Sequence, residues 1–298
     1  MKDRSKLTTE KRNLKTADID RCSTIEIVDI INSQDMLVAP AVAKQRKRIA
    51  AAVNVIVQSF NSGGRLFYVG AGTSGRLGVL DAAECPPTYG VRASMVQGII
   101  AGGRRALVRS VEGAEDIADN GAKAIAKKNL KPADVVVGIA ACGITPFVLG
   151  AMKKAKQIGA ATIFITCAPQ AVKYIPADII INPVVGPEVI TGSTRMKAGT
   201  ATKLVLNTLT TAAMIKIGKV YGNLMVDLRA TNEKLEDRSE RIIMETTGLS
   251  RAAAKSLLKK ADGLVKPAIV MKVKKVDLKT ALKILRDCGQ SLRSAISQ

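Results

Sequence analysis

Residues 65–76 read RLFYVGAGTSGR, in which a short apolar run is followed by three glycines and two hydroxyl side chains. The apolar run predicts a buried strand, and the residues after the glycines have the apolar spacing of a helix. Glycines let the backbone approach a bound anion, and the N–H groups at a helix start point toward it. We therefore expect Gly72, Thr73 and Ser74 to bind an anionic group, although a tight turn without a ligand would need the same glycines. The loop lacks the Gly-Lys-Ser/Thr ending of nucleotide P-loops, which favours a phosphorylated small molecule over ATP.

Similar short apolar segments recur along the chain. The strand candidates are residues 65–69, 94–100, 134–140, 162–166 and 178–182. They are often β-branched, as buried parallel strands are, and helical or loop stretches separate them. This alternation predicts an α/β fold with a doubly wound parallel five-stranded sheet in a three-layer sandwich. Ligands bind such sheets at the carboxyl ends of the strands, so the loops after these strands are the candidate binding loops.

Helical patterns flank the predicted sheet. Residues 23–32 and 41–60 have helical apolar spacing, and the sequence NSGG at 61–64 ends the second of these helices. A long helix is expected at 198–217. From about residue 240 onward the pattern predicts a separate small helical unit, in which Ser250 and Asp277 cap helices.

Composition bounds the class of protein. With 298 residues and 47% apolar residues, the chain can bury a large core. It has no apolar run long enough for a transmembrane helix and no signal-peptide pattern at its N-terminus, so we expect a cytoplasmic protein without a membrane anchor. The five cysteines form no CxxC pair and histidine is absent, which excludes a zinc site and every Ser-His or Cys-His nucleophile. Acid–base chemistry must therefore come from Glu, Asp, Lys, Tyr or Cys.

The net charge of +21 is concentrated toward the C-terminus. Residues 251–298 contain twelve Lys or Arg and three Asp, which gives 12 − 3 = +9. A nucleic-acid partner is one explanation. However, aromatic residues make up only 3% and tryptophan is absent, which removes most stacking platforms for single strands. We therefore expect no nucleic-acid partner, and a solvated basic surface that attracts phosphorylated small molecules.

Two carboxylates follow the glycine loop. Glu84 precedes Cys85-Pro86-Pro87, and the two prolines are expected to stop the helix and hold Glu84 at a rigid end near the ligand cleft. Glu115 lies in the acidic stretch EGAED. The alternatives are a surface carboxylate for Glu84 and a solvated helix start for Glu115.

A second small turn, ACGITP at 141–146, follows the third predicted strand. Cys142, Gly143 and Thr145 are candidate anion ligands there, with Pro146 at the first helical position. An ordinary strand-to-helix turn is the alternative.

Hydroxyl and cationic side chains also cluster before the long helix. These candidates are Ser193, Thr194, Arg195 and Lys197. Two hydroxyls and two cations at a helix start favour an anion site over a solvated helix end.

Several motifs together carry a family resemblance. They are TEKRN at 9–13, DID at 18–20, GAGTSGRLG at 70–78, ECPPT at 84–88, EGAED at 112–116, GSTRMKAGT at 192–200 and GNLMVD at 222–227. With these motifs the chain resembles N-acetylmuramic acid 6-phosphate etherases, members of the sugar isomerase (SIS) domain superfamily, over nearly its whole length. The resemblance implies three parts: an N-terminal helical segment (1–55), a SIS sugar-phosphate-binding domain (56–220), and a linker with a small C-terminal helical domain (221–298).

The resemblance also implies a reaction. Etherases are carbon–oxygen lyases without a cofactor or metal, which cleave the D-lactyl ether of the sugar by elimination and then add water. In this chain Glu84 would be the proton donor and Glu115 the second acid or base. The family's members are homodimers with sites near the subunit interface.

Two loops depart from the family's pattern. Cys142 and Ile144 stand where the family usually has serine and arginine, and Ala168 stands where it often has asparagine. These changes leave both glutamates intact but remove polar groups from ligand-side loops. They keep open a second function, a non-catalytic sugar-phosphate-binding regulator, and a third, an aldose–ketose isomerase on the same fold.

Overall fold

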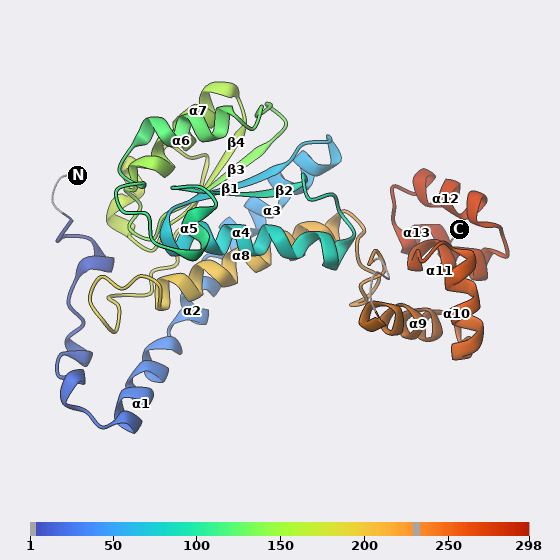
Figure 1. Ribbon diagram of the computed structural model, residues 1–298, viewed down its shortest axis with the longest axis horizontal. Helices are drawn as coiled ribbons and strands as arrows, with labels where there is room; N and C mark the ends of the chain where they lie inside the picture. The colour runs from blue at the N-terminus through green and yellow to red at the C-terminus, as the bar shows by residue number, and fades with distance from the viewer. Residues whose placement is uncertain (1–3, 229–232, 298) are drawn as a thin grey trace. The chain divides into compact units, whose positions relative to one another are not determined.

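A parallel five-stranded sheet forms the centre of the larger of two compact units (Figure 1). The structure, a computed structural model, describes residues 4–228 and 233–297. The larger unit comprises residues up to 83 together with 94–210, and the smaller one 84–93 together with the residues from 211 onward. The predicted domain boundaries at residues 55 and 220 are not tested by this division.

The sheet has the strand order β2-β1-β3-β4-β5, and every neighbouring pair is parallel. Its strands are β1 (Leu66–Gly70), β2 (Val96–Ile100), β3 (Val135–Ile139), β4 (Ala161–Ile165) and β5 (Ile179–Ile181). All five predicted strands are confirmed, with slightly different bounds. β1 and β3 are buried along their whole length, which explains their continuous apolar sequence.

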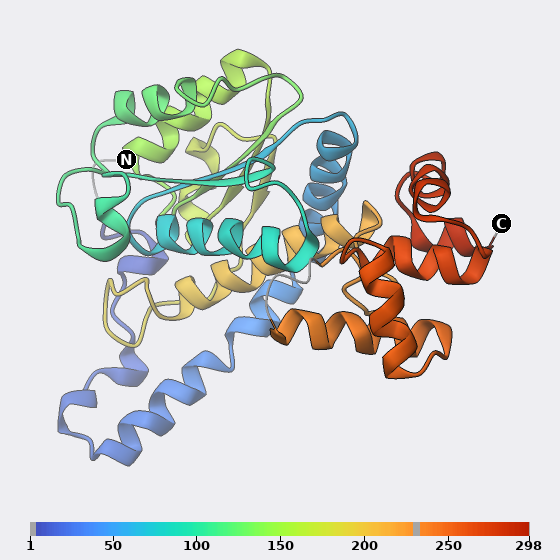
Figure 2. The same ribbon diagram turned by 45° about the vertical axis from the view of Figure 1, so that its right-hand side comes forward.

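Helices cover both faces of the sheet (Figures 1 and 2). One face carries α6 (Ala118–Ala126) and α7 (Pro146–Ile158), and the other carries α3 (Arg46–Asn61), α4 (Gly72–Tyr89) and α8 (Lys197–Lys216). The predicted three-layer α/β sandwich is therefore confirmed. The other elements before β5 are α1 (Thr24–Asp35), α2 (Val38–Ala43), α5 (Arg105–Val108) and the 3₁₀ turns η1 (Thr8–Glu10), η2 (Leu14–Thr16), η3 (Ile19–Arg21) and η4 (Pro169–Tyr174).

Two helix predictions need correction. The helix expected at 41–60 is two helices, α2 and α3, separated by Lys44 and Gln45. The side-chain amide oxygen of Gln45 accepts the backbone N–H of Asn182 after β5. The two prolines do not stop α4. They lie in its last turn, the helix continues to Tyr89, and Gly90, with φ +63°, follows it.

The smaller unit is helical. It contains α9 (Glu233–Thr247), α10 (Arg251–Lys260), α11 (Val265–Lys274), α12 (Leu278–Asp287) and α13 (Leu292–Ser297). Ser250 and Asp277 accept backbone N–H groups at the starts of α10 and α12, as predicted. Lys266 is buried, and its ammonium donates to the carbonyls of Gly218 and Gln290 and to Asp227. Burial lowers the pKa of Lys266, and Asp227 opposes this effect.

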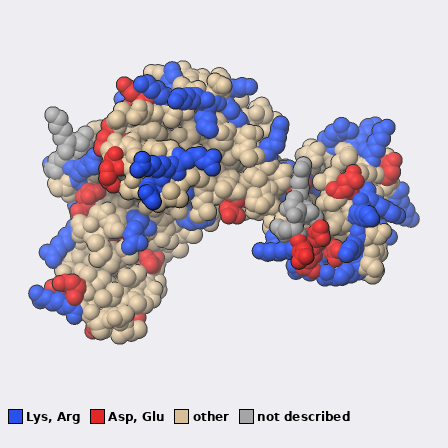
Figure 3. Space-filling view, in the orientation of Figure 1, with Lys and Arg blue, Asp and Glu red and all other residues tan. Residues whose placement is uncertain are grey.

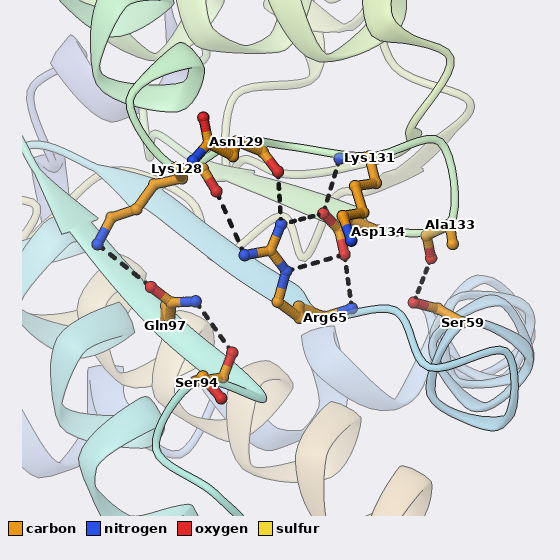
Figure 4. A network of polar contacts seen from close by, with 9 residues as sticks. All are labelled: Ser59, Arg65, Ser94, Gln97, Lys128, Asn129, Lys131, Ala133 and Asp134. Carbon is orange, nitrogen blue, oxygen red and sulfur yellow. Dashed lines mark hydrogen bonds and ion pairs between the residues drawn. The ribbon is translucent and has the colours of Figure 1, made fainter.

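A polar network joins the amino ends of β1 and β3 (Figure 4). The guanidinium of Arg65 donates to both carboxylate oxygens of Asp134, at 3.2 and 2.7 Å, and to the carbonyls of Lys128 and Asn129. Asp134, which is 1% exposed, also accepts the backbone N–H groups of Arg65 and Lys131. This network fixes the amino ends of the two strands. The candidate binding loops lie at the opposite end of the sheet, where they follow the carboxyl ends of the strands.

None of the helices within residues 4–228 and 233–297 combines the length and apolar content that a bilayer crossing requires.

We expect Asp134→Ala to lower the free energy of unfolding by about 3 kcal/mol, because it leaves a partly buried guanidinium and two N–H groups without their acceptor. Urea unfolding followed by circular dichroism measures this loss. Lys156→Ala is the matched control, since its ion pair with Asp178 is half-exposed on both sides and should contribute less than about 1 kcal/mol. Equal losses in the two variants would contradict the structural importance of this network.

Candidate functional site

A cavity of about 240 Å³ lies at the carboxyl ends of β1 and β3. Five chain segments line it: the N-terminal segment, the glycine loop, the loop between α5 and α6, the loop between β3 and α7, and the loop before α8. The lining residues are Arg4, Glu10, Ala71, Gly72, Thr73, Ser74, Glu115, Ile139, Ala140, Ala141, Cys142, Thr145, Pro146, Gly192 and Thr194. Seven of the twelve predicted site residues are among them, so this is the candidate site.

A second cavity, of about 270 Å³, adjoins the first. Both cavities are lined by Ala71, Gly72 and Glu115. The second one extends along residues 110–116 to Arg76, whose guanidinium donates to the carbonyl of Leu107 at 3.1 Å. Glu115 thus borders both cavities, where its carboxylate can reach a ligand that occupies either.

The three glycines of the loop have separate tasks. A Cβ on Gly70 would lie 2.6 Å from the backbone nitrogen of Gly75, and one on Gly75 would lie 2.6 Å from the side chain of Ile100. These two glycines therefore allow α4 to start directly against the end of β1. Gly72 has φ +51°, a left-handed conformation that glycine adopts readily. The first turn of α4 consequently presents its N–H groups, together with Thr73 and Ser74, at the first cavity.

The loop between β3 and α7 forms a second wall. Cys142 is half-buried, and its sulfur lies 3.7 Å from the hydroxyl of Thr145. Pro146 begins α7, as predicted, so Thr145 stands at a second helix start that faces the cavity. Gly143 is buried outside the cavity lining. Its φ is +75°, and a Cβ at this position would lie 2.5 Å from the Cβ of Ala171 and 2.9 Å from the hydroxyl of Thr166, so the turn requires a glycine.

Phe147, in the first turn of α7, holds the backbone of Glu115. Its N–H donates to the carbonyl of Glu115 at 2.9 Å. Residues 110–117 form no helix or strand, and the side chain of Glu115 is exposed on them. This backbone contact therefore fixes where the loop crosses the mouth of the cavities.

The loop before α8 is held by a buried carboxylate. Glu188 is 1% exposed, and its two oxygens accept the backbone N–H groups of Lys197 and Ala198 at 3.0 and 2.9 Å. Burial raises the pKa of Glu188, while the two N–H groups and Lys197 oppose this effect. Burial together with the charge of Glu188 raises the pKa of Cys167 to about 12, which keeps that thiol protonated at neutral pH.

The four predicted anion-binding residues of this loop lie in different surroundings in the structure. Thr194 lines the first cavity, Ser193 is half-buried outside its lining, and Arg195 is exposed. Lys197 is 1% exposed, and its ammonium donates to the side-chain oxygen of Gln34 at 2.9 Å. Lys197 therefore connects α1 to the start of α8, and its ammonium does not line the cavity.

Glu84 lies on α4, exposed, and lines neither cavity. It follows Gly72 by twelve residues, which is about 18 Å along a helix. The expectation that the prolines hold it at a helix end near the ligand cleft assumed a helix that stops before them. The unbroken helix carries Glu84 away from the glycine loop of its own chain.

Five charged residues that line these cavities were not among the predicted site residues. Arg4 and Glu10 line the first cavity, and Arg76, Glu112 and Asp116 line the second. Arg76 could have been found because it ends the quoted loop. Arg4 and Glu10 lie in a segment of 3₁₀ turns whose sequence has no periodicity, so only the matched TEKRN motif marked one of them.

A larger cavity, of about 680 Å³, lies beside the edge strand β2. Its lining is apolar apart from Asn120 and four cations, Arg104, Lys123, Lys127 and Lys128, and it includes no hydroxyl and no carboxylate. It therefore lacks the acid–base and hydroxyl groups of the cavities at the strand ends. Figure 3 shows Lys and Arg side chains spread over the visible face with acidic side chains among them.

Within the described ranges, 4–228 and 233–297, no three His, Cys, Asp or Glu side chains are grouped closely enough to hold a metal ion.

Comparison with known proteins gives close relatives. The chain is 55% identical over 283 residues to an N-acetylmuramic acid 6-phosphate etherase of Rhodopirellula baltica, covering 95% of this chain and 94% of that one. It is 54% identical over 291 residues to a protein of the same name from Mesorhizobium japonicum, covering 98% and 95%. Residues 48–156 match the family described as glucokinase regulatory protein N-terminal SIS domain. Among solved structures, phosphoheptose isomerase from Neisseria gonorrhoeae aligns with a TM-score of 0.47 and 17% identity, over 64% of this chain and 98% of that one.

Glu188→Gln tests whether the buried carboxylate holds the loop as described. Because burial raises the pKa of Glu188 above its unfolded value, its stabilising contribution is complete below the unfolded pKa and is lost as pH rises through the folded pKa. Glutamine does not titrate. The stability of the wild type relative to the variant should therefore decline as pH rises from about 4 through the folded pKa, which burial holds above the ordinary 4.5. Urea unfolding of both proteins across this range measures it, and a difference that grows with pH would refute the assignment.

Proposed function

Because the chain belongs to the N-acetylmuramic acid 6-phosphate etherase family, we propose that it cleaves the D-lactyl ether of N-acetylmuramic acid 6-phosphate, giving N-acetylglucosamine 6-phosphate and D-lactate. The observation that carries this proposal is the 55% identity over nearly the full length of both chains. The reaction is a carbon–oxygen lyase step of amino-sugar catabolism. The protein would act in the cytoplasm.

The cavity supports this reaction with suitable chemistry. The substrate's phosphate would bind at the first turn of α4, with Thr73, Ser74 and Thr145 as hydroxyl donors. In the open-chain sugar the aldehyde acidifies the proton on C2. Removal of that proton by a carboxylate base and protonation of the departing lactate oxygen would break the C3–O bond and leave a C2–C3 double bond. Water then adds to C3 and a proton returns to C2.

Two carboxylates in different positions suit this division of labour. We assign Glu84 as the proton donor and Glu115 as the second acid or base. Glu115 stands at the cavity in the same chain. Glu84 lies about 18 Å along α4 from the loop and lines neither cavity, and we therefore infer that the two glutamates meet one substrate only across two chains.

A homodimer resolves this separation. In a symmetric dimer each partner can contribute the same residue to the other's site. We propose that Glu84 of one copy completes the cavity of the second copy. The exposed apolar side chains of α1, Ile25 at 66% and Val28 at 45%, offer a surface that a second chain can cover.

We expect purified protein to release D-lactate from N-acetylmuramic acid 6-phosphate, measured with a coupled lactate dehydrogenase. Glu115→Gln and Glu84→Gln should each lower kcat by about 10²–10⁴-fold, because each removes a proton-transfer group. Glu236→Gln, an exposed change on α9, is the control and should keep full activity. Reaction in D₂O should place deuterium at C2 of the product. Full turnover in either glutamate variant would refute the mechanism.

The same assay separates the rival functions. Tight binding of a sugar phosphate without lactate release would instead favour the regulator. Two observations support that alternative: the presence of Cys142 and Ile144 in the second loop, and the match of residues 48–156 to the SIS domain of glucokinase regulatory protein. A ketose phosphate as product would favour the isomerase.

Co-expression of Glu84→Gln and Glu115→Gln chains under two affinity tags tests whether the site is shared. If Glu84 acts across the dimer, a mixed dimer has one site with both glutamates and one site with neither. The purified mixed dimer should then show about half of the wild-type activity, whereas each variant alone is inactive. An inactive mixed dimer would place both glutamates in one chain. Light scattering during gel filtration gives the oligomeric state.

A further inference from the structure

The N-terminal segment is attached to the larger unit on both sides of residue 10. Leu7 is fully buried in the core cluster that contains Phe67 and Phe147. The side-chain oxygen of Gln170 accepts from both the N–H and the hydroxyl of Thr8, each at 3.2 Å. Further along, the hydroxyl of Thr16 donates to the carbonyl of Val189 at 2.7 Å.

This attachment places two charged side chains in the first cavity. Glu10 is half-buried there, and a Cβ on Gly192, across the cavity wall, would lie 3.5 Å from its carboxylate oxygen. Arg4 is the one cation in the lining of this cavity, as far as the described residues extend. The cavity thus holds two carboxylates, Glu10 and Glu115, and one guanidinium.

We propose that Glu10 and Arg4 are substrate-binding residues, with Glu10 accepting hydrogen bonds from the sugar and Arg4 pairing with the carboxylate of the lactyl group. This inference rests on the proposed function. An ionised carboxylate only accepts hydrogen bonds, so Glu10 requires the donors of the substrate, which are its hydroxyls and the acetamido N–H. Glu10 also repels a phosphate. The phosphate is therefore directed to the helix starts at Thr73 and Thr145, where N–H groups and helix dipoles favour it.

The second anionic group of the substrate is then the lactyl carboxylate. It needs a cation away from the phosphate, and a guanidinium pairs with a carboxylate through two parallel N–H···O bonds. Arg4 is the residue of the lining that can make this pair. The two side chains consequently differ in what they recognise: Glu10 the sugar, which substrate and product share, and Arg4 the lactyl group, which only the substrate has.

Kinetics of lactate release test both roles. Glu10→Gln should lower kcat/KM by about 10- to 100-fold, because it replaces an ionic acceptor with a neutral amide, and Glu10→Asp should recover part of that loss. Arg4→Ala should raise KM by about 10-fold or more while kcat changes less. Asp287→Asn and Arg286→Ala on α12, both exposed and outside the cavity lining, are the matched controls. Circular dichroism confirms that each variant is folded.

Calorimetric titration with N-acetylglucosamine 6-phosphate and with N-acetylmuramic acid 6-phosphate on Glu115→Gln backgrounds separates the two residues without turnover. Glu10→Gln should weaken both ligands, and Arg4→Ala should weaken only the one that carries the lactyl group. Wild-type affinities in both variants would overturn this inference while lactate release still upholds the proposed function. Absence of lactate release by the wild type, with these binding differences present, would refute the function and leave the two assignments standing. No binding of either sugar phosphate to the wild type would overturn both.

Discussion

The close approach of Gly70 and Gly75 determines where the site can be. A side chain at either position would collide with the backbone or with Ile100, so β1 and α4 can join through so short a loop only because both residues are glycine. The same approach brings the first N–H groups of α4 to the carboxyl edge of a parallel sheet. In this topology the loops after β1, β2 and β3 reach that edge as well. The close approach of these two glycines therefore places the start of α4 at the same edge of the sheet as the other loops.

Buried polar contacts then fix those loops. Glu188 holds the start of α8 through two backbone N–H groups, and Lys197 ties the same turn to Gln34 on α1. Phe147 fixes the backbone of Glu115 from the start of α7. Each of these groups lies outside the cavity, yet each decides where a cavity residue stands. Burial of Glu188 costs free energy, as the direction of its pKa shows, so the precise position of the loop is obtained at the expense of some stability.

Periodicity predicted most of the fold because the sheet is buried on both faces. Five apolar, β-branched runs separated by helical patterns leave few alternatives to a doubly wound sheet, and all five runs became strands. The glycine loop and Thr145 with Pro146 were found for the same reason, since each lies where a strand ends, whereas Glu115 was singled out by the acidic stretch EGAED and by the family resemblance. The order of the strands has no signature in such runs, because a parallel crossover can lead to either side of the sheet.

The errors have a common physical cause, which is that the role of a side chain depends on partners far away in the chain. The neighbours of Lys197 in the sequence predict an anion site, but its ammonium donates a hydrogen bond to Gln34, 163 residues away. Arg4 and Glu10 lie in 3₁₀ turns without a repeating pattern, and only the burial of Leu7 and the contacts of Thr8 bring them to the cavity. The prolines after Glu84 are tolerated because they fall in the last turn of α4.

The length of α4 has a consequence for the whole assembly. A straight helix is a fixed spacer of about 1.5 Å per residue, and nothing within it can bring residue 84 back to the loop at residue 72. If the reaction requires both Glu84 and Glu115, the helix must deliver its carboxylate to a different copy of the cavity. Under that condition the dimer is part of the active site, and the length of α4 sets how far Glu84 stands from the glycine loop of its own chain.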